Sequence, residues 1–332
     1  MTKSRQSLLT APVVCPRDAY PPTNIQRPTS GLSHSCYDEI LRIGIHTTSQ
    51  GTLEKTALKA HALGANTFQI FSASPRMWRA SPPSAADVKL LHRARANLDL
   101  KPLVIHDNYL INLASIDPTI RQKSIACFRG ELERAVAIGA EYLVAHPGSY
   151  KDQSLENGIR HFVQGLAEAA QNLARGGTML LIECTAGGGF HIGSRFEELR
   201  AIRDLAAAAS DLPIGYCLDT CHLLAAGYDI RSEAGLARTI RDADRILGMP
   251  NVKLIHANDS KTPLGSRADR HQNIGQGHIG EDAFRRILAH PELRNLPFIL
   301  ETPVDNEGDD RRNLEILKKL CPKRSTIKTK SS

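Results

Sequence analysis

Residues 252–271, VKLIHANDSKTPLGSRADRH, join a short apolar run to a charged loop. The run has the composition of a buried strand and is followed at once by His256. Pro263 and Gly265 keep the charged part out of a helix. The same arrangement, an apolar run that ends in a polar side chain and a turn, recurs along the chain and decides its predicted fold.

Eight such runs alternate with segments of helical spacing. The runs are 41–46, 67–72, 102–106, 142–147, 179–185, 214–220, 252–258 and 297–302. Strands that alternate with helices form parallel sheets with right-handed crossovers, so we predict an α/β fold, a single (β/α)8 TIM barrel. A doubly wound open sheet is the alternative, but it seldom has eight regular units, and no glycine-rich turn follows the first strand.

Capping residues give the helix boundaries. Ser84, Asp282 and Ser194 are predicted helix starts, and Gly64 and Gly139 are predicted helix ends.

In a TIM barrel the active site lies at the C-terminal ends of the strands. The side chains at these ends are His46, His106, His146, Glu183, Asp219, His256 and Glu301. A lone histidine at a strand end is most often a hydrogen-bonded loop residue, but metal-type side chains at seven of eight ends predict a metal site. For His46, contact with a metal and support of the site are both open.

Three further candidates lie nearby, His222 and the pair Asp269 and His271. The spacing of the pair points both side chains the same way in an extended segment. Mixed nitrogen and oxygen ligands suit zinc first, with manganese or iron as substitutes.

The ends of the chain differ from the centre. Residues 1–40 are rich in proline and lack periodicity, so we predict a disordered extension, for which organelle targeting remains open. Residues 41–320 are the predicted catalytic domain, and 321–332 are a predicted basic, disordered tail. The net charge of +7 comes from the ends, because residues 41–317 hold 32 basic and 32 acidic side chains. Overall charge is therefore weak support for a DNA-binding face on the domain itself.

Neither hydropathy nor cysteine usage points outside the cytoplasm. No apolar stretch reaches the about eighteen residues that a membrane span needs, and seven cysteines without a CxxC pair favour a reducing compartment. We expect a cytoplasmic protein with no membrane partner, associated with the nucleoid if the source is bacterial. No protein partner is implied, and a monomer suffices.

Six motifs resemble the endonuclease IV family of apurinic/apyrimidinic endonucleases. They run in family order over residues 42–302 and leave both tails outside. The motifs are HDNYLINLAS (106–115), AHPGS (145–149), IECTAGGG (182–189), CLDTCHLLAAGYD (217–229), HANDSKTPLGSRADRHQNIGQGHIG (256–280) and ILET (299–302).

The resemblance implies a TIM barrel that holds three zinc ions. The first would be bound by His106, His146 and Glu183, the second by Glu183, Asp219, His256 and Glu301, and the third by His222, Asp269 and His271. Glu183 would be the catalytic residue that anchors a metal-bridging hydroxide, the nucleophile. The implied reaction is a DNA-repair step: hydrolysis of the phosphodiester 5′ to an abasic site in double-stranded DNA, leaving a 3′-hydroxyl and a 5′-deoxyribose phosphate.

Two stretches depart from the family pattern. Cys184 stands where the family usually has asparagine, which puts hydrogen bonding around the metals and the metal preference in doubt. The stretch IHTTSQGTL (45–53) matches the first-strand motif only loosely.

Basic and bulky loop residues are candidates for DNA contact. By family position these are Arg76 and Tyr109, while packing of loop against barrel is the alternative for Tyr109 and Trp78. Phosphate contacts are predicted for Lys261, Arg267 and Arg270.

Two other functions remain in view. A sugar isomerase or epimerase with a related barrel would need the quartet around Glu183 but not His222, Asp269 and His271. A noncatalytic metal- or nucleic-acid-binding protein would bind DNA without nicking it, and the complete ligand set argues against this.

Overall fold

Eight parallel strands close into a barrel in the computed structural model, which describes residues 41–48, 51–174 and 176–322. The strands are β1 (Ile43–His46), β2 (Thr67–Phe71), β3 (Leu103–His106), β4 (Tyr142–Ala145), β5 (Met179–Glu183), β6 (Ile214–Asp219), β7 (Val252–His256) and β10 (Phe298–Leu300). Their order around the barrel is β1-β10-β7-β6-β5-β4-β3-β2, and β1 pairs with β2 to close it. The predicted TIM barrel is confirmed, with most strands one or two residues shorter than the apolar runs.

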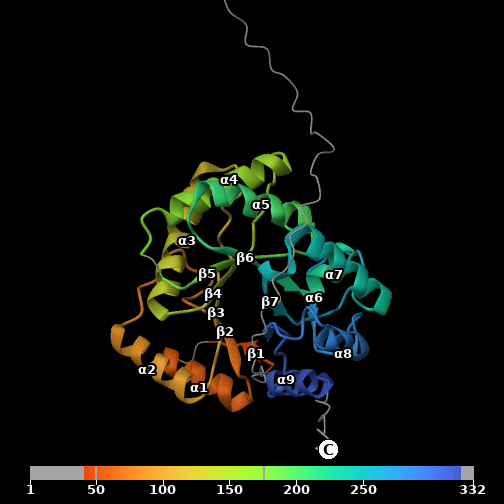
Figure 1. The fold of residues 1–332 in the computed structure, drawn as a ribbon. Helices are drawn as coiled ribbons and strands as arrows, with labels where there is room; N and C mark the ends of the chain where they lie inside the picture. Colours follow the sequence, from red (N-terminus) through yellow and green to blue (C-terminus); the bar gives the residue numbers. More distant parts are fainter. Residues whose placement is uncertain (1–40, 49–50, 175, 323–332) are drawn as a thin grey trace, which may run out of the picture. The chain divides into compact units, whose positions relative to one another are not determined.

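Helices surround this barrel (Figure 1). They are α1 (Leu53–Leu63), α2 (Ala85–Asn97), α3 (Pro118–Ile138), α4 (Leu155–Ala170), α5 (Phe196–Ala209), α6 (Thr220–Ala226), α7 (Glu233–Leu247), α8 (Glu281–Ala289) and α9 (Asp309–Leu320), with a 3₁₀ turn η1 (Met249–Asn251). Two additions to the simple repeat lie at the C-terminal rim: α6, which follows β6 directly, and an antiparallel pair, β8 (Asp259–Ser260) with β9 (His271–Gln272).

Three of the five predicted helix boundaries are confirmed. The Ser84 hydroxyl accepts the Asp87 N–H at the start of α2. Gly64 and Gly139 end α1 and α3 with φ of 98° and 71°, a conformation that glycine adopts without a Cβ penalty.

Ser194 and Asp282 are not helix starts. Helix α5 is preceded by Arg195, whose side chain makes no cap, and the Glu198 carboxylate reaches back to accept the Gly193 N–H at 2.7 Å. An acid within the first turn thus takes the capping role expected of a preceding serine. Helix α8 begins at Glu281, which puts Asp282 inside its first turn, where a negative charge interacts favourably with the helix dipole.

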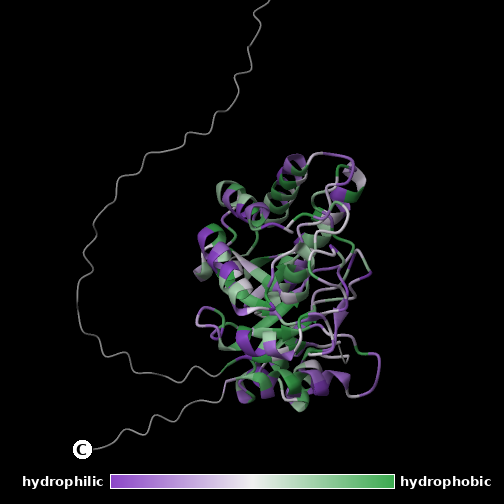
Figure 2. Ribbon diagram, turned by 90° about the vertical axis from the view of Figure 1, so that its right-hand side faces the viewer, coloured by the Kyte–Doolittle hydropathy of each residue, from purple (hydrophilic) through white to green (hydrophobic). Residues whose placement is uncertain are grey.

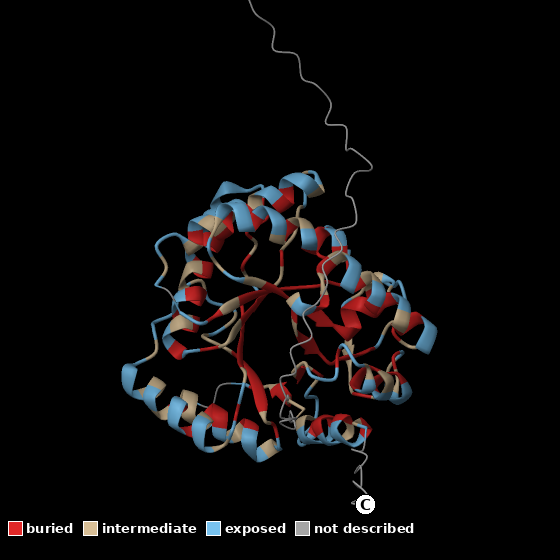
Figure 3. Ribbon diagram, in the orientation of Figure 1, coloured by how far each residue is buried: buried red, intermediate tan, exposed pale blue. Residues whose placement is uncertain are grey.

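Apolar side chains form two layers. The outer layer packs the helices against the barrel, so buried residues line the strands and the inner helix faces while the outer helix faces are exposed (Figure 3). Hydropathy follows the same division, with apolar residues along the strands and hydrophilic ones in the loops and on the outer helices (Figure 2). A smaller layer fills the barrel interior.

Several predictions about the chain ends stay predictions. Residues 1–40 and 323–332 lie outside the described residues, so the predicted extension and most of the predicted tail do too. Among the helices described, none is long and apolar enough to cross a membrane.

Gly44 on β1 allows β1 and β2 to approach closely where the barrel closes. A Cβ at this position would lie 1.9 Å from the Thr67 carbonyl oxygen of β2, a backbone atom that cannot move aside. We expect Gly44→Ala to lower the free energy of unfolding, measured in urea, by about 1–3 kcal/mol, which is the typical cost of overpacking. Gly177→Ala is the control because no atom lies within 4 Å of its added Cβ. Equal midpoints for the two variants would contradict the close-approach argument.

Candidate metal centre

Strand periodicity gathers the polar side chains at one mouth of the barrel. The interior apolar layer consists of Val104, Val144, Leu181, Cys217, Leu254 and Ile299. Because side chains alternate along a strand, residues two positions later point into the same interior one layer higher. Those residues are His106, His146, Glu183, Asp219, His256 and Glu301. The apolar layer therefore forms the floor of a polar ring.

His106, His146 and Glu183 form the first group. The Nε2 atoms of His106 and His146 lie 3.2 and 3.5 Å from Glu183 Oε2. Two ligands on one tetrahedral zinc, with bonds of about 2.0–2.2 Å, are roughly 3.3–3.6 Å apart. These separations therefore leave room for a shared cation.

Glu183, Asp219, His256 and Glu301 form the second group. His256 Nδ1 lies 3.0 Å from Glu183 Oε1 and 3.2 Å from Glu301 Oε2. Glu183 thus presents one carboxylate oxygen to each of the first two groups.

The third group lies at the edge of the ring. Asp269 Oδ2 is 3.2 Å from His222 Nε2, and Asp269 Oδ1 is 3.3 Å from His271 Nε2. His222 comes from α6 and the other two from the β8–β9 segment. Asp219 also approaches, 3.7 Å from His271 Nε2, and the possible ligand atoms of Cys221, Asp269 and His271 lie within 4.8 Å of one another. The structure thus brings together all nine predicted ligands, whose roles as ligands stay predictions.

Hydrogen bonds to backbone carbonyls orient three of these imidazoles. The Nδ1 atoms of His106, His222 and His271 lie 2.9–3.0 Å from the carbonyl oxygens of Asp107, Cys184 and Glu301. A proton on Nδ1 leaves Nε2 with a lone pair, the state that binds metal. In the described residues, Nε2 of His222 and of His271 is buried and has no hydrogen-bond partner. Two unpaired lone pairs that face a carboxylate fit a cation between them.

The Glu183 carboxylate stays ionised at the centre of the ring although it is fully buried. Burial alone would raise the pKa of Glu183, but the nearby His256 and His146 imidazoles hold that pKa well below its usual range. Burial lowers the pKa of His146 to about 4, so this ring is neutral at neutral pH and free to act as a ligand. A fully buried, ionised carboxylate among imidazoles favours bound cations.

The β8–β9 segment is held in place by one side chain. The buried Asp259 carboxylate accepts five backbone N–H groups at 2.7–3.2 Å, those of Ser260, Gly275, Gly277, Ile279 and Gly280. A Cβ on Gly277 would lie 2.4 Å from Asp259 Oδ1, so glycine is needed for this approach. The result is an arm, residues 259–280, that returns Asp269 and His271 to the ring.

Two buried amides that no sequence pattern pointed to belong to the site. Asn258 donates to Asp219 Oδ2 at 2.6 Å and accepts the Glu301 N–H at 2.8 Å. Gln69 on β2 bonds to Glu301, His46 and His256. Strand alternation could have found Gln69, because it lies two residues before Phe71, the end of β2, and pairs with His46 on the neighbouring strand.

His46 and Cys184 support the ring and belong to none of the three groups. His46 Nδ1 lies 3.2 Å from Glu301 Oε1, so support is the better description of the role left open for His46. The Cys184 sulfur accepts the Asp219 N–H at 3.2 Å. The Asp219 carboxylate belongs to the second group and also approaches His271 of the third group. The described cysteines are all free.

The predicted DNA contacts lie on loops at the same mouth. Arg76 and Tyr109 are exposed on neighbouring loops after β2 and β3, joined by the Tyr109 N–H to the Pro75 carbonyl. Trp78 packs partly buried against the core, which supports packing for that residue. Lys261, Arg267 and Arg270 are exposed on the arm. Their contact with DNA stays a prediction.

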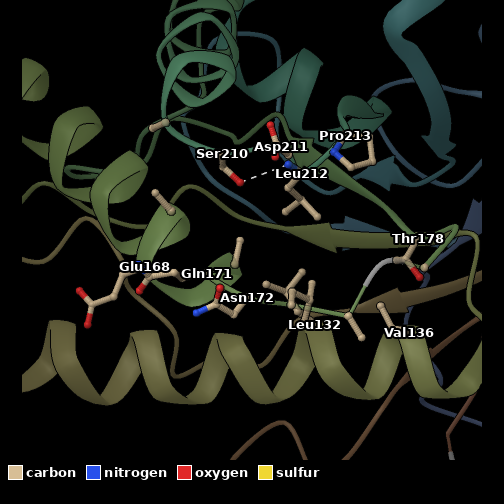
Figure 4. A pocket seen from close by; sticks show the side chains of 16 residues that line it. Leu132, Val136, Glu168, Gln171, Asn172, Thr178, Ser210, Asp211, Leu212 and Pro213 are labelled. Carbon is tan, nitrogen blue, oxygen red and sulfur yellow. Dashed lines mark hydrogen bonds between the residues drawn. The ribbon is translucent and has the colours of Figure 1, made fainter.

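A cavity at the opposite end of the barrel is separate from this site. It has a volume of about 1080 Å³ and is lined by residues before β5 and β6, such as Thr178 and Pro213, and by Leu132 and Val136 of α3 (Figure 4). None of the groups that could hold a metal in the described chain lies there.

Comparison with known proteins agrees with this geometry. A family model described as xylose isomerase-like TIM barrel matches residues 57–320. Probable endonuclease 4 of Solibacter usitatus (strain Ellin6076) is 62% identical over 281 residues, covering 85% of this chain and 97% of the relative. The crystal structure of endonuclease IV from Thermus thermophilus is 37% identical with a TM-score of 0.73, covering 84% of this chain and 98% of that one. A D-tagatose 3-epimerase-like protein, 20% identical with a TM-score of 0.61 over 84% of this chain and 97% of that one, shares the fold alone.

We expect Asp259→Asn to loosen the arm, because an amide nitrogen cannot accept the backbone N–H groups that the carboxylate holds. The unpaired groups should lower the free energy of unfolding by about 1–3 kcal/mol, and cation affinity of the third group should fall by about 10–100-fold. Thermal unfolding and metal content by elemental analysis measure both effects. Asp282→Asn, an exposed change on α8, is the control, and an arm variant that matches it in both measurements would contradict the anchoring role.

Proposed function

The chain belongs to the endonuclease IV family of xylose isomerase-like TIM barrels, and we propose that this DNA-repair endonuclease cleaves the phosphodiester 5′ to an abasic site. The single observation that carries the proposal is the third group, in which the Asp269 carboxylate on the arm lies 3.2 and 3.3 Å from Nε2 of His222 and of His271, beside a ring that already holds two groups. The products would be a 3′-hydroxyl and a 5′-deoxyribose phosphate.

We propose three zinc ions as the cofactors, with manganese or iron as substitutes. His106, His146 and Glu183 would hold one, Glu183, Asp219, His256 and Glu301 the next, and His222, Asp269 and His271 the last. When bound, such ions stabilise charge on a phosphodiester and lower the pKa of water. The unpaired Nε2 atoms of His222 and His271 and the ligand separations of 3.2 and 3.3 Å support this assignment.

Glu183 is the proposed catalytic residue because it lies between two groups. Its two oxygens face His106 on one side and His256 on the other, 3.2 and 3.0 Å away. A carboxylate in this position can orient a water molecule toward a phosphorus atom placed between the groups. The apolar floor formed by Leu181 and its neighbours closes the ring from below and excludes other water.

The substrate should approach through the loops around the mouth. Residues 41–317 carry no net charge, so three divalent cations would make the loaded domain positive and attractive to phosphate. Exposed Arg76, Lys261, Arg267 and Arg270 lie on those loops and suit backbone phosphates. Tyr109 is 65% exposed, with its ring edge-on to Phe71 at 5.1 Å, and can fill the gap that a missing base leaves in a stack.

The alternatives are weaker. A sugar isomerase would use the quartet around Glu183 but has no need of the arm, and the epimerase-like neighbour supports the fold alone. A noncatalytic DNA-binding protein has no use for three complete groups.

A monomer in a reducing cytoplasm suits the five free cysteines of the described residues.

We expect the zinc-loaded protein to nick a duplex that holds one abasic-site analogue, and a chelator to abolish the nick. Glu183→Gln should lower the cleavage rate by at least about 10²–10³-fold, because a neutral amide cannot serve both groups. Labelled DNA on denaturing gels gives the rate, and Glu197→Gln, an exposed change on α5, is the control. Intact DNA together with turnover of a ketose would favour the isomerase, and a fully active Glu183→Gln protein would refute the role of Glu183.

We expect Tyr109→Ala to weaken binding of the abasic duplex by about 5- to 150-fold, the loss of roughly 1–3 kcal/mol of stacking. Fluorescence anisotropy at fixed salt measures the affinity. Leu205→Ala, which removes an exposed apolar side chain from the outer face of α5, is the matched control. Equal affinities for the two variants would show that Tyr109 does not contact the DNA.

A further inference from the structure

The one strand without a metal-type side chain still supplies a polar group to the ring. Gln69 on β2 is fully buried, with an exposed fraction of 0%. A buried amide without hydrogen-bond partners would destabilise the fold, so the partners of the Gln69 amide indicate its role.

The Gln69 amide bonds to three members of the ring. Its Nε2 lies 2.6 Å from Glu301 Oε1 and 2.9 Å from His46 Nδ1. Its Oε1 lies 2.9 Å from His256 Nε2. Both amide protons and one carbonyl lone pair are therefore used within the site.

Only one orientation of this amide satisfies its neighbours. The Glu301 carboxylate can only accept, so the amide nitrogen must face Glu301. The carbonyl oxygen then faces His256 Nε2 and can only accept, which places the His256 proton on Nε2. His256 Nδ1 is left with a lone pair, 3.0 Å from Glu183 Oε1 and 3.2 Å from Glu301 Oε2.

We infer that Gln69 is a positioning residue for the second group: it selects the His256 tautomer that can bind a cation through Nδ1 and fixes the Glu301 carboxylate beside it. The inference rests on the proposed function, because the cation is the one assigned there to Glu183, Asp219, His256 and Glu301. His46 has a secondary part, since its Nδ1 accepts the second amide proton and helps hold the amide in place.

The inference predicts a selective effect on metal binding. Gln69→Met keeps a similar volume and removes all three hydrogen bonds. Loss of such a hydrogen-bond partner typically weakens a metal site by about 10–100-fold, and we expect that loss for one zinc ion. The other two ions should keep their affinities, because Gln69 bonds to no proposed ligand of the first or third group. The first group shares Glu183 with the second, but Gln69 bonds to Glu301 and His256 of the second group and not to Glu183.

Chelator competition followed by elemental analysis measures these affinities without any cleavage assay. Thr67→Val is the matched control: Thr67 lies on the same strand, is equally buried, and its hydroxyl donates to the Pro102 carbonyl at 2.6 Å, away from the ring. The expected result is three tightly bound zinc ions in the wild type and in Thr67→Val. In Gln69→Met, one of the three ions should bind more weakly. Wild-type affinities for all three ions in Gln69→Met, or equal losses in both variants, would overturn the inference.

A measurement on the wild type covers the case in which Gln69→Met does not fold. Long-range ¹H–¹⁵N spectra of the zinc-loaded protein with labelled histidine should show the His256 proton on Nε2, and a proton on Nδ1 would overturn the inference. A wild-type protein that retains no zinc would refute the metal assignment in the proposed function, and the inference would fall with it. Three bound ions with an unaffected Gln69→Met protein would refute the inference alone.

Discussion

Glu183 is a fully buried carboxylate in contact with four imidazole rings, and the rest of the rim is arranged around that charge. His106, His146, His222 and His256 approach its oxygens within 3.0–3.5 Å. Burial of an ionised group is costly unless opposite charge or hydrogen bonds compensate it. The closed sheet makes this possible, because it brings side chains that are far apart in sequence to one layer above an apolar floor. Placement and charge together give a site that is preorganised for cations.

The sequence was sufficient for the barrel, because apolar runs of strand length recur with regular spacing and each ends in a recognisable side chain. It also pointed to the six members of the ring that lie at strand ends, since strand ends in a closed barrel must meet, whereas the third group was assigned by the family resemblance. It was insufficient where an identity depends on tertiary partners. Gln69 reads as an ordinary polar residue within β2, and its role appears only when His256 and Glu301 lie beside it. The missed starts of α5 and α8 have a similar cause, because in α5 the Glu198 side chain replaces the expected cap.

The polar side chains at the mouth of the barrel come from two kinds of element. The quartet around Glu183 depends on strand ends alone, whereas His222 comes from the added helix α6 and its two partners from the segment that Asp259 holds. The added parts contact each other, since the N–H groups of Gly265 and Arg267 bond to carbonyls of α6. Strand ends alone thus place the quartet, and α6 together with the arm adds the third group beside it.

The position of β10 between β1 and β7 has a consequence for biosynthesis. This last strand closes the barrel, precedes Glu301 directly and, through the Glu301 carbonyl, orients His271. A growing polypeptide on the ribosome folds from its N-terminus, yet it has neither a closed cylinder nor a complete ligand set until residue 301 has emerged. A nascent chain that has not yet reached residue 301 therefore lacks both the closing strand and the Glu301 carboxylate, so the barrel and its ring of polar side chains are completed in the same step of synthesis.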